Sequence, residues 1–468
     1  MEVKIPRILI SSGYSGVGKS TFGIGLAVAL RKRNLSIAFG VKGPNLLQAN
    51  AYHRLSRRYT RSFDKQIYGN DQMLETLRQA ATGADLVIIE GEAGLFDGTR
   101  PGSLEGSDAE FAIHTGTPVV LLLNPGEYEA SFSAVVRGFL DLAPSLQIGG
   151  IIANRLQSVS TQAMAKGRSF YDAALQGFNM SSLLGALPES KALAPISRGR
   201  DAFREDGQAV FPRQFFVSMG SLVESHVDLE RLLEIAHTAA PIEMDTEGII
   251  PMMRRCRIGV ADDSCFGLCF QDNLDLLRLF GAKLVSFSPL ADLRLPGGLG
   301  GLYIPGGNIG EYAAELSANQ DMKDSIRDFI SQGGVVYSEG AGTAYLCQQF
   351  ATGANSERYV SGVGAIPAIA QAYDPFLNYT ESVMAEDCIL GVRGSVVNGI
   401  SANNWMLDGD ISLYKVMNLS YAGEKPILEG FSPNAQVIGT FCFNNFASNP
   451  FIAKNLVDAC SVVCGITE

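Results

Sequence analysis

The sequence predicts two α/β domains in one chain of 468 residues. Short, almost continuously apolar runs alternate with longer amphipathic runs, a pattern typical of parallel strands joined by helices. The alternation lapses over residues 238–254, which carry proline, glycine and acids, and then resumes. The length also exceeds what a single hydrophobic core usually serves. We therefore expect a doubly wound parallel-sheet domain at residues 1–245 and a second α/β domain at residues 246–468.

The expected elements follow in order along the chain. In the first half we expect a helix at 19–33 and strands at 6–13, 36–43, 85–94, 118–126 and 148–156. In the second half we expect strands at 254–262, 283–289, 300–308 and 334–342, and helices at 273–282, 322–333 and 449–463. Residues 350–468 otherwise show shorter, more β-like segments. Because parallel strands end at a common edge, site residues should collect where the strands of the first half end.

Composition narrows the function classes. Hydrophobic residues make up 46% of the chain and charged residues 18%, and the net charge is −11. An acidic protein is a poor ligand for nucleic acid, so we expect no nucleic-acid partner. No signal peptide or membrane-spanning run is visible, so we expect a cytoplasmic protein that does not bind membranes. The basic stretch 54–61 is either a solvated face or a contact for a polyanionic substrate.

Eight cysteines are scattered through apolar segments of the second half. Reduced, buried thiols are the default for that pattern. Cys265 and Cys269, like Cys460 and Cys464, are four residues apart, but no histidine lies nearby. We therefore expect no cysteine metal site.

A phosphate-binding loop occupies Gly13 to Ser20, which fits G-x-x-x-x-G-K-[ST] without mismatch. It follows an expected strand and opens an expected helix, as this motif requires. Glycines let backbone N–H groups turn toward phosphate oxygens, and the helix N-terminus adds positive charge. The expected ATP-binding residues are Gly13, Ser15, Gly16, Val17, Gly18, Lys19, Ser20 and Thr21. Lys19 would neutralise the β- and γ-phosphates, and Ser20 would ligate Mg²⁺.

Three polar residues at strand ends are candidate partners of this loop. Glu90 ends the run DLVIIE and is the expected second Mg²⁺ ligand, although alone it could be a surface acid. Asp97 is either catalytic or a turn former before Gly98. Asn154 either reads a base edge or caps a turn. Together Lys19, Glu90 and Asp97 form the expected catalytic set.

These motifs resemble those of the cobyrinic acid a,c-diamide synthase family. The resemblance is carried by the phosphate loop, EGEAGLFDG at 90–98, GIIANR at 150–155 and GGLYIPGGN at 300–308. It continues through GGVVYSEGAGTAYL at 333–346 and FASNPFIAKNLV at 446–457, and so covers essentially the whole chain. It implies a dethiobiotin-synthetase-like ATP domain followed by a class I glutamine-amidotransferase-like domain. It also implies a carboxylate-activating ligase acting on a tetrapyrrole, with Asp97 near metal or substrate and Asn154 on adenine.

The second domain departs from the family at its glutaminase residues. The family's nucleophilic cysteine follows a glutamate, and here Gly340 follows Glu339. The family's histidine-containing strand carries Phe443 and Asn445. A second histidine motif is replaced by GISANN at 399–404. All four histidines lie before the linker, so this domain cannot assemble a Cys–His pair from its own residues. Ser338 lacks an activating base.

The first domain also departs from the family. The family's G-P-D-x-x-D is GPNLLQ here, with neutral Asn45 and Gln48 in place of both acids. Amides are weaker Mg²⁺ ligands than carboxylates. His53, just downstream, is either a substrate contact or an ordinary loop histidine.

Three functions are compatible with these features. The first is an ATP-dependent ligase that joins a carboxylate to ammonia or an amine without glutaminase activity of its own, with a possible partner glutaminase. The second is a non-catalytic accessory subunit that binds nucleotide or tetrapyrrole, favoured by Asn45 and Gln48. The third is an ATPase or kinase acting on an unrelated small acid. We also expect a homodimer.

Overall fold

The computed structural model describes residues 2–126, 128–156, 167–190, 213–243, 252–402, 404–408, 414–421 and 427–465. The chain divides into two compact units. Unit 1 comprises Met1–Lys65 and Met73–Thr246, and unit 2 comprises Gln66–Gln72 and Glu247–Glu468. Residues 244–251 of the expected linker at 238–254 lie outside the described residues. Among the described residues, no helix has the length and apolarity needed to cross a membrane.

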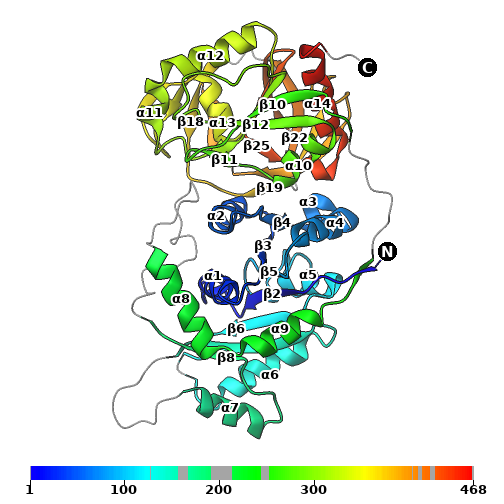
Figure 1. Cartoon of the computed structure of the whole chain (residues 1–468), viewed down its shortest axis with the longest axis vertical. Coiled ribbons are helices and arrows are strands. Elements are labelled where there is room, and N and C mark those ends of the chain that lie inside the picture. Colours follow the sequence, from blue (N-terminus) through cyan, green and yellow to red (C-terminus); the bar gives the residue numbers. More distant parts are fainter. Residues whose placement is uncertain are drawn as a thin grey trace. The chain divides into compact units, whose positions relative to one another are not determined.

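Unit 1 is built on a parallel sheet of seven strands in the order β4-β3-β5-β2-β6-β7-β8 (Figure 1). The strands are β2 (Arg7–Ser12), β3 (Ile37–Lys42), β4 (Arg61–Phe63), β5 (Leu86–Glu90), β6 (Val119–Leu123), β7 (Ile148–Leu156) and β8 (Gly185–Pro188). A separate pair, β1 (Glu2–Val3) and β9 (Ile242–Glu243), is antiparallel. The five strands expected from the sequence all belong to the main sheet, and the doubly wound parallel fold is confirmed.

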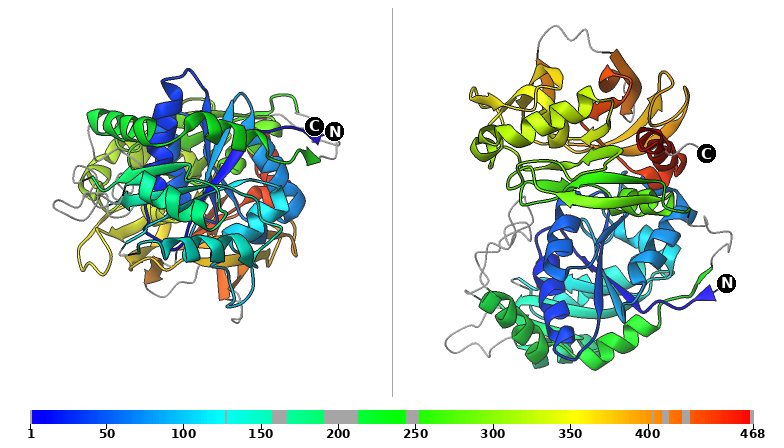
Figure 2. Two further views of the ribbon diagram at one scale, coloured as in Figure 1. Left: turned by 90° about the horizontal axis from the view of Figure 1, so that it is seen from below. Right: turned by 45° about the horizontal axis from the view of Figure 1, so that its top comes forward.

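Helices cover both faces of this sheet (Figure 2). They are α1 (Lys19–Arg31), α2 (Leu46–Ser56), α4 (Asn70–Ala81), α5 (Asp108–Thr115), α6 (Phe132–Leu142), α7 (Arg168–Gly177), α8 (Arg213–His226) and α9 (Leu229–His237). One core cluster joins α1, α2, α8 and α9 to the strands. Strand β2 is buried at all six positions, which fits its central place in the sheet.

Unit 2 contains a mixed sheet of ten strands in the order β12-β10-β13-β15-β24-β23-β22-β19-β20-β25. They are β10 (Cys256–Ala261), β12 (Ala282–Phe287), β13 (Gly301–Ile304), β15 (Val335–Glu339), β19 (Asn378–Met384), β20 (Val396–Ser401), β22 (Tyr414–Tyr421), β23 (Ile427–Asn434), β24 (Val437–Thr440) and β25 (Cys442–Asn444). The first four in the order, with β24, pair in parallel, and the remaining pairs are antiparallel. The β-like character expected after residue 350 is thus present.

Smaller elements complete unit 2. A four-stranded sheet contains β16 (Cys347–Ala351), β17 (Tyr359–Ser361), β18 (Ile366–Ala372) and β21 (Trp405–Asp408), and β11 (Phe266–Leu268) pairs with β14 (Gly306–Gly307). The helices are α10 (Gln271–Leu279), α11 (Ala313–Ala318), α12 (Gln320–Ser331), α13 (Ala341–Leu346) and α14 (Phe451–Val463), with a 3₁₀ turn η2 (Phe446–Ser448). The segment Gln66–Gln72, with part of α3 (Lys65–Tyr68), also belongs here: the Tyr68 hydroxyl donates to Asp272 Oδ2 at 2.7 Å.

Candidate functional site

The phosphate loop connects β2 to α1, as the motif requires. Gly16 and Gly18 have φ values of +87° and +112°, which glycine adopts far more readily than other residues. The side chain of Val17 is fully buried and anchors the loop in the core. No side chain caps the start of α1 and no acid lies in its first turn. The first turn is therefore a favourable place for an anion.

Lys19 lies buried at the start of α1. Its Nζ donates to the carbonyl oxygen of Ala93 at 2.7 Å and to Ser12 Oγ at 3.1 Å. Burial lowers the pKa of Lys19, and the nearby carboxylates, Asp108 foremost, oppose that shift. The ammonium is thus fixed by the protein before any phosphate arrives.

The expected pair of Mg²⁺ ligands is brought together. Ser20 Oγ donates to Glu90 Oε1 at 2.5 Å. The other carboxylate oxygen, Oε2, accepts from the Tyr52 hydroxyl and, at 3.4 Å, from Gln48 Nε2. Burial raises the pKa of Glu90, while the hydrogen bonds from Ser20 and Tyr52 oppose the rise. Tyr52 was not predicted, although its position four residues after Gln48 places both on one face of a helix.

Asp97 and Asn154 both contact backbone. Asp97 Oδ2 accepts from the N–H of Gly94 at 2.9 Å, which makes Asp97 the closing residue of a turn. Asn154 Nδ2 donates to the carbonyl oxygen of Val17 at 2.7 Å, so Asn154 supports the phosphate loop. A Cβ on Gly18 would lie 2.8 Å from the same nitrogen. Nothing larger than glycine fits there without a shift.

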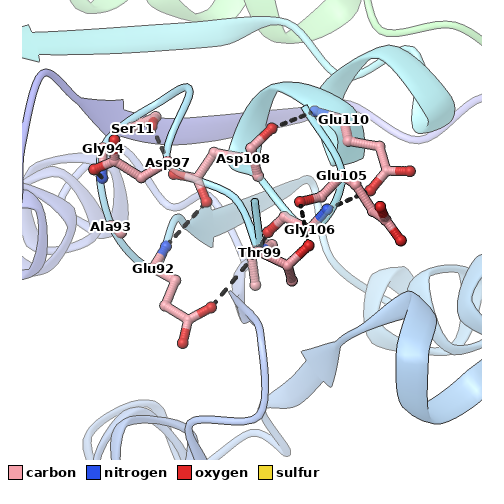
Figure 3. Close-up of polar contacts among 12 residues, drawn as sticks. Ser11, Glu92, Ala93, Gly94, Asp97, Thr99, Glu105, Gly106, Asp108 and Glu110 are labelled. Atoms are coloured by element: carbon pink, nitrogen blue, oxygen red, sulfur yellow. Dashed lines mark hydrogen bonds and ion pairs between the residues drawn. The ribbon is translucent and has the colours of Figure 1, made fainter. Parts of the chain in front are cut away.

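Two buried charged residues near the loop, Lys42 and Asp108, and their exposed neighbour Glu92 were missed by sequence reasoning. Lys42 ends β3, donates to the carbonyl oxygen of Gly106 and pairs with Glu92 at 3.5 Å. Asp108 begins α5 and accepts from Ser11 Oγ at 2.6 Å and from the Glu92 N–H at 3.1 Å (Figure 3). Burial raises the pKa of both Asp108 and Glu92. Lys42 could have been predicted from the sequence, because β3 is parallel to β5 and ends at the same edge of the sheet as Glu90.

Asn45 and Gln48, for which the resemblance implies acids, form contacts within unit 1. Asn45 Oδ1 accepts from the Gln48 N–H at 3.0 Å and caps α2. His53 Nδ1 lies 3.1 Å from the carbonyl oxygen of Arg58, and its ring stacks on Tyr59. His53 lies within α2 and not in a loop as expected, and these contacts are structural. Arg58, in the basic stretch, donates to Ser36 Oγ and to backbone carbonyls, which favours the structural interpretation of that stretch.

In unit 2, Gly340 lies in the strand-to-helix turn where the resemblance predicts a nucleophile. Gly340 joins β15 to α13 with φ +51° and ψ −125°, a strained conformation for any residue with a side chain. A Cβ built on Gly340 would lie 2.6 Å from Phe443 Cζ, and one on Gly306 would lie 2.5 Å from Phe443 Cε1. The Phe443 ring thus fills the space between the two glycines. None of these three residues carries a thiol or an imidazole.

The other candidate groups of this site have structural roles. Asn445 Oδ1 accepts from the Ala447 N–H at 2.8 Å and caps η2. Ser338 is fully buried, and its Oγ lies 2.9 Å from Thr343 Oγ1. Cys347 Sγ donates to the Thr343 carbonyl oxygen at 3.4 Å, and burial raises the pKa of its thiol. Asn403, in the other motif expected to have lost histidines, lies outside the described residues.

Beside the turn lies a fully buried carboxylate, Glu339. It accepts from the hydroxyls of Tyr303 and Tyr337, each at 2.7 Å, and from the Asn444 N–H at 3.0 Å. Burial raises the pKa of Glu339 to about 7, although these three donors oppose the rise. Its surroundings are those of a satisfied core group.

The two units define a class of α/β protein in which a P-loop domain is followed by a class I glutamine-amidotransferase-like domain. Residues 257–379 match the CobB/CobQ-like glutamine amidotransferase domain family. A cobyrinate a,c-diamide synthase of Leptospira interrogans is 31% identical to this chain, over 98% of this chain and 99% of that protein. One of Dehalococcoides mccartyi is 30% identical, over 99% of this chain and 100% of that protein.

The chain belongs to the cobyrinate a,c-diamide synthase family. The resemblance drawn from the sequence motifs is thereby confirmed, and with it the assignment to a family of ligases. Among solved structures, a PurLQS structure from Thermotoga maritima covers 43% of this chain and 97% of its own, at 12% identity and a TM-score of 0.34. That likeness is too slight to carry an argument.

Proposed function

We propose that this chain is an ATP-dependent ligase that converts a carboxylate of a tetrapyrrole into an amide. It would do so without glutaminase activity of its own. The observation that carries the proposal is the assembled phosphate site, in which Lys19 is fixed by Ala93 and Ser20 meets Glu90. The chain keeps these groups while its amidotransferase-like unit places Phe443 against Gly340. Activation of the acid is thus supported, and release of ammonia from glutamine is not.

The reaction has two steps. A carboxylate oxygen attacks the γ-phosphorus of ATP, the bond to the β,γ-bridging oxygen breaks, and ADP leaves. The nitrogen lone pair of ammonia or an amine then attacks the acyl carbon, phosphate leaves with the C–O electron pair, and the nitrogen loses a proton. Such transfers depend on positioning and on charge neutralisation around the phosphoryl group. Lys19 supplies positive charge, and the loop supplies N–H donors.

The oxygen groups of Ser20 and Glu90 fit Mg²⁺, a hard cation that prefers oxygen ligands. These two residues would hold the ion, which would neutralise negative charge on the phosphoryl group. Among the described residues, no three or more His, Cys, Asp or Glu side chains are grouped to hold a metal by themselves. The protein would therefore supply only part of the coordination, and water and phosphate oxygens are the usual remaining ligands of Mg²⁺. Asn154 would act on the nucleotide through the loop that it supports, since its Nδ2 donates to the carbonyl oxygen of Val17.

The proposal is tested with purified protein, Mg-ATP, ammonium chloride or glutamine, and a panel of tetrapyrrole acids. We expect ADP formation that depends on acid and ammonia, and a product whose mass spectrum shows a carboxyl group converted to an amide. Glutamine should not replace ammonia unless a separate glutaminase is added. Lys19→Ala should abolish nucleotide binding. Absence of acid-dependent ADP across the panel would sink the ligase proposal, and unchanged ATP affinity in Lys19→Ala would refute the nucleotide site.

One observation favours a second function, a nucleotide- or tetrapyrrole-binding accessory subunit. Gln48 and Tyr52 donate to Glu90, so that carboxylate has protein partners that do not require a cation. A binding subunit would retain ATP affinity that Lys19→Ala removes, yet show no turnover with any acid and amine. The same assay therefore separates the two functions.

A further inference from the structure

Asp108 is a buried carboxylate that ties together three segments of unit 1. Its Oδ2 accepts from Ser11 Oγ at 2.6 Å, and its Oδ1 accepts from the Glu92 N–H at 3.1 Å. Ser11 lies in β2, Glu92 lies just after β5, and Asp108 itself begins α5. A Cβ on Gly91 would lie 1.9 Å from Asp108 Oδ2, so the approach of this carboxylate requires glycine at position 91.

The two groups bound by Asp108 are chain neighbours of the two groups that hold Lys19. Ser11 precedes Ser12, whose Oγ accepts from Lys19 Nζ at 3.1 Å. Glu92 precedes Ala93, whose carbonyl oxygen accepts from the same nitrogen at 2.7 Å. A shift of either segment would therefore move an acceptor of the phosphate-loop lysine.

We propose that Asp108 is a positioning residue for phosphate binding, which holds Ser12 and Ala93 so that Lys19 is fixed in the phosphate loop. The inference rests on the nucleotide site of the proposed function. Asp108 touches neither nucleotide nor substrate in this role. Its effect falls on the part of a nucleotide that Lys19 would meet, the β- and γ-phosphates.

A simpler role exists for the same residue. An acid in the first turn of a helix interacts favourably with the helix dipole and would stabilise α5 alone. That role affects the stability of the protein and treats all nucleotides alike. A positioning role discriminates between nucleotides that carry β- and γ-phosphates and those that do not.

The test is nucleotide binding by the intact chain, measured calorimetrically with adenylyl imidodiphosphate and with AMP. The variants are Asp108→Asn, which removes the charge at constant size, and Ser11→Ala, which removes one hydroxyl. The matched control is Asp172→Asn in α7, where the carboxylate also accepts a backbone N–H, that of Leu183 at 2.7 Å, and a side-chain donor. Thermal unfolding reports whether each variant is folded.

We expect Asp108→Asn to weaken adenylyl imidodiphosphate binding roughly tenfold, the range of coupling between contacting residues, and to leave AMP binding within about twofold. Ser11→Ala should act in the same direction more weakly, and Asp172→Asn should change neither affinity. Equal losses for both ligands, or no loss in a folded variant, would overturn the proposal. If Asp108→Asn does not fold, an unchanged affinity ratio in Ser11→Ala overturns it. The binding assay contains no carboxylate substrate. A negative result in this assay is therefore distinct from failure of the ligase reaction.

Discussion

The ring of Phe443 packs against the α-carbon of Gly340, so closely that a Cβ on Gly340 would lie 2.6 Å from Phe443 Cζ. Contacts under 3.0 Å are essentially never made by real Cβ atoms, so something must shift if Gly340 acquires a side chain. The turn at Gly340 and the ring at Phe443 are thus mutually adapted. Gly340 and Phe443 therefore belong to one packing arrangement.

Gly340→Ala should destabilise the protein by about 2–6 kcal/mol. The φ of +51° and ψ of −125° contribute strain of roughly 1–3 kcal/mol, and overpacking against Phe443 contributes a similar amount. Urea denaturation measures the change in the free energy of unfolding. Phe443→Ala in the same background should recover part of the loss, because it removes the clash and leaves the strain.

Two other glycines separate these effects. Gly333 has a φ of +85° and no atom within 4 Å of the place where a Cβ would stand, so Gly333→Ala should show strain alone, about 1–2 kcal/mol. Gly353 has neither positive φ nor a close neighbour, and Gly353→Ala should stay within about 0.5 kcal/mol. A loss for Gly340→Ala no larger than that for Gly333→Ala would show that Phe443 does not block the position.

Gly340→Cys should not create a glutaminase. A thiol needs a base to form the attacking thiolate, and all four histidines of the chain precede residue 238. Glutamate released from glutamine, measured with a coupled dehydrogenase, should equal that of the unmodified protein and of a blank. Addition of a commercial glutaminase confirms that the assay works in the same buffer. Glutamate above the blank in either protein would contradict this interpretation of unit 2.

Glu339 should make the protein less stable as pH rises from about 4.5 to 7. The folded pKa of Glu339, about 7, exceeds the ordinary value of 4.5, because burial disfavours the charged form. Below pH 4.5 both states are protonated. Between the two pKa values, Glu339 is ionised in the unfolded chain but protonated in the folded protein, which favours unfolding. Above pH 7 the loss of unfolding free energy levels off at about 3 kcal/mol.

Glu339→Gln isolates this contribution, since glutamine does not titrate. The difference in unfolding free energy between the two proteins, measured from pH 4 to 8, should grow in favour of the variant through this window. The exposed Glu357→Gln serves as control and should follow the unmodified protein. A difference that is constant with pH would mean that Glu339 titrates normally in the folded state.

Local sequence was enough to predict the phosphate loop, since spacing within eight residues defines it. The contact between Ser20 and Glu90 was also predictable, because parallel strands end at one edge of the sheet. The contacts of Asp108 were not, because they join residues 97 positions apart through the packing of α5. The motif predicted Phe443 to be a degenerate glutaminase position, but only the structure shows that its ring lies where a Cβ on Gly340 would stand.

Gln48 offers the last prediction, because the resemblance implies an acid at this position. Its Nε2 lies 3.4 Å from Glu90 Oε2 and donates to it, a contact that needs no cation. Gln48→Glu keeps the size of the side chain and sets two carboxylates beside each other. Their repulsion is relieved by a divalent cation held between oxygen ligands.

In Gln48→Glu, the Mg²⁺ concentration needed for half-maximal binding of ADP should therefore fall roughly tenfold. That change corresponds to about 1.4 kcal/mol of binding free energy. Without Mg²⁺, the same variant should unfold at a lower temperature than the unmodified protein. Asn45→Asp is the matched control: its oxygen caps α2 by accepting from the Gln48 N–H, and an aspartate retains that bond. Titration of Mg²⁺ against a fluorescent ADP analogue measures all three proteins. Equal changes in both variants would show that any added acid attracts the ion, and that the contact between Gln48 and Glu90 does not set the metal requirement of this site.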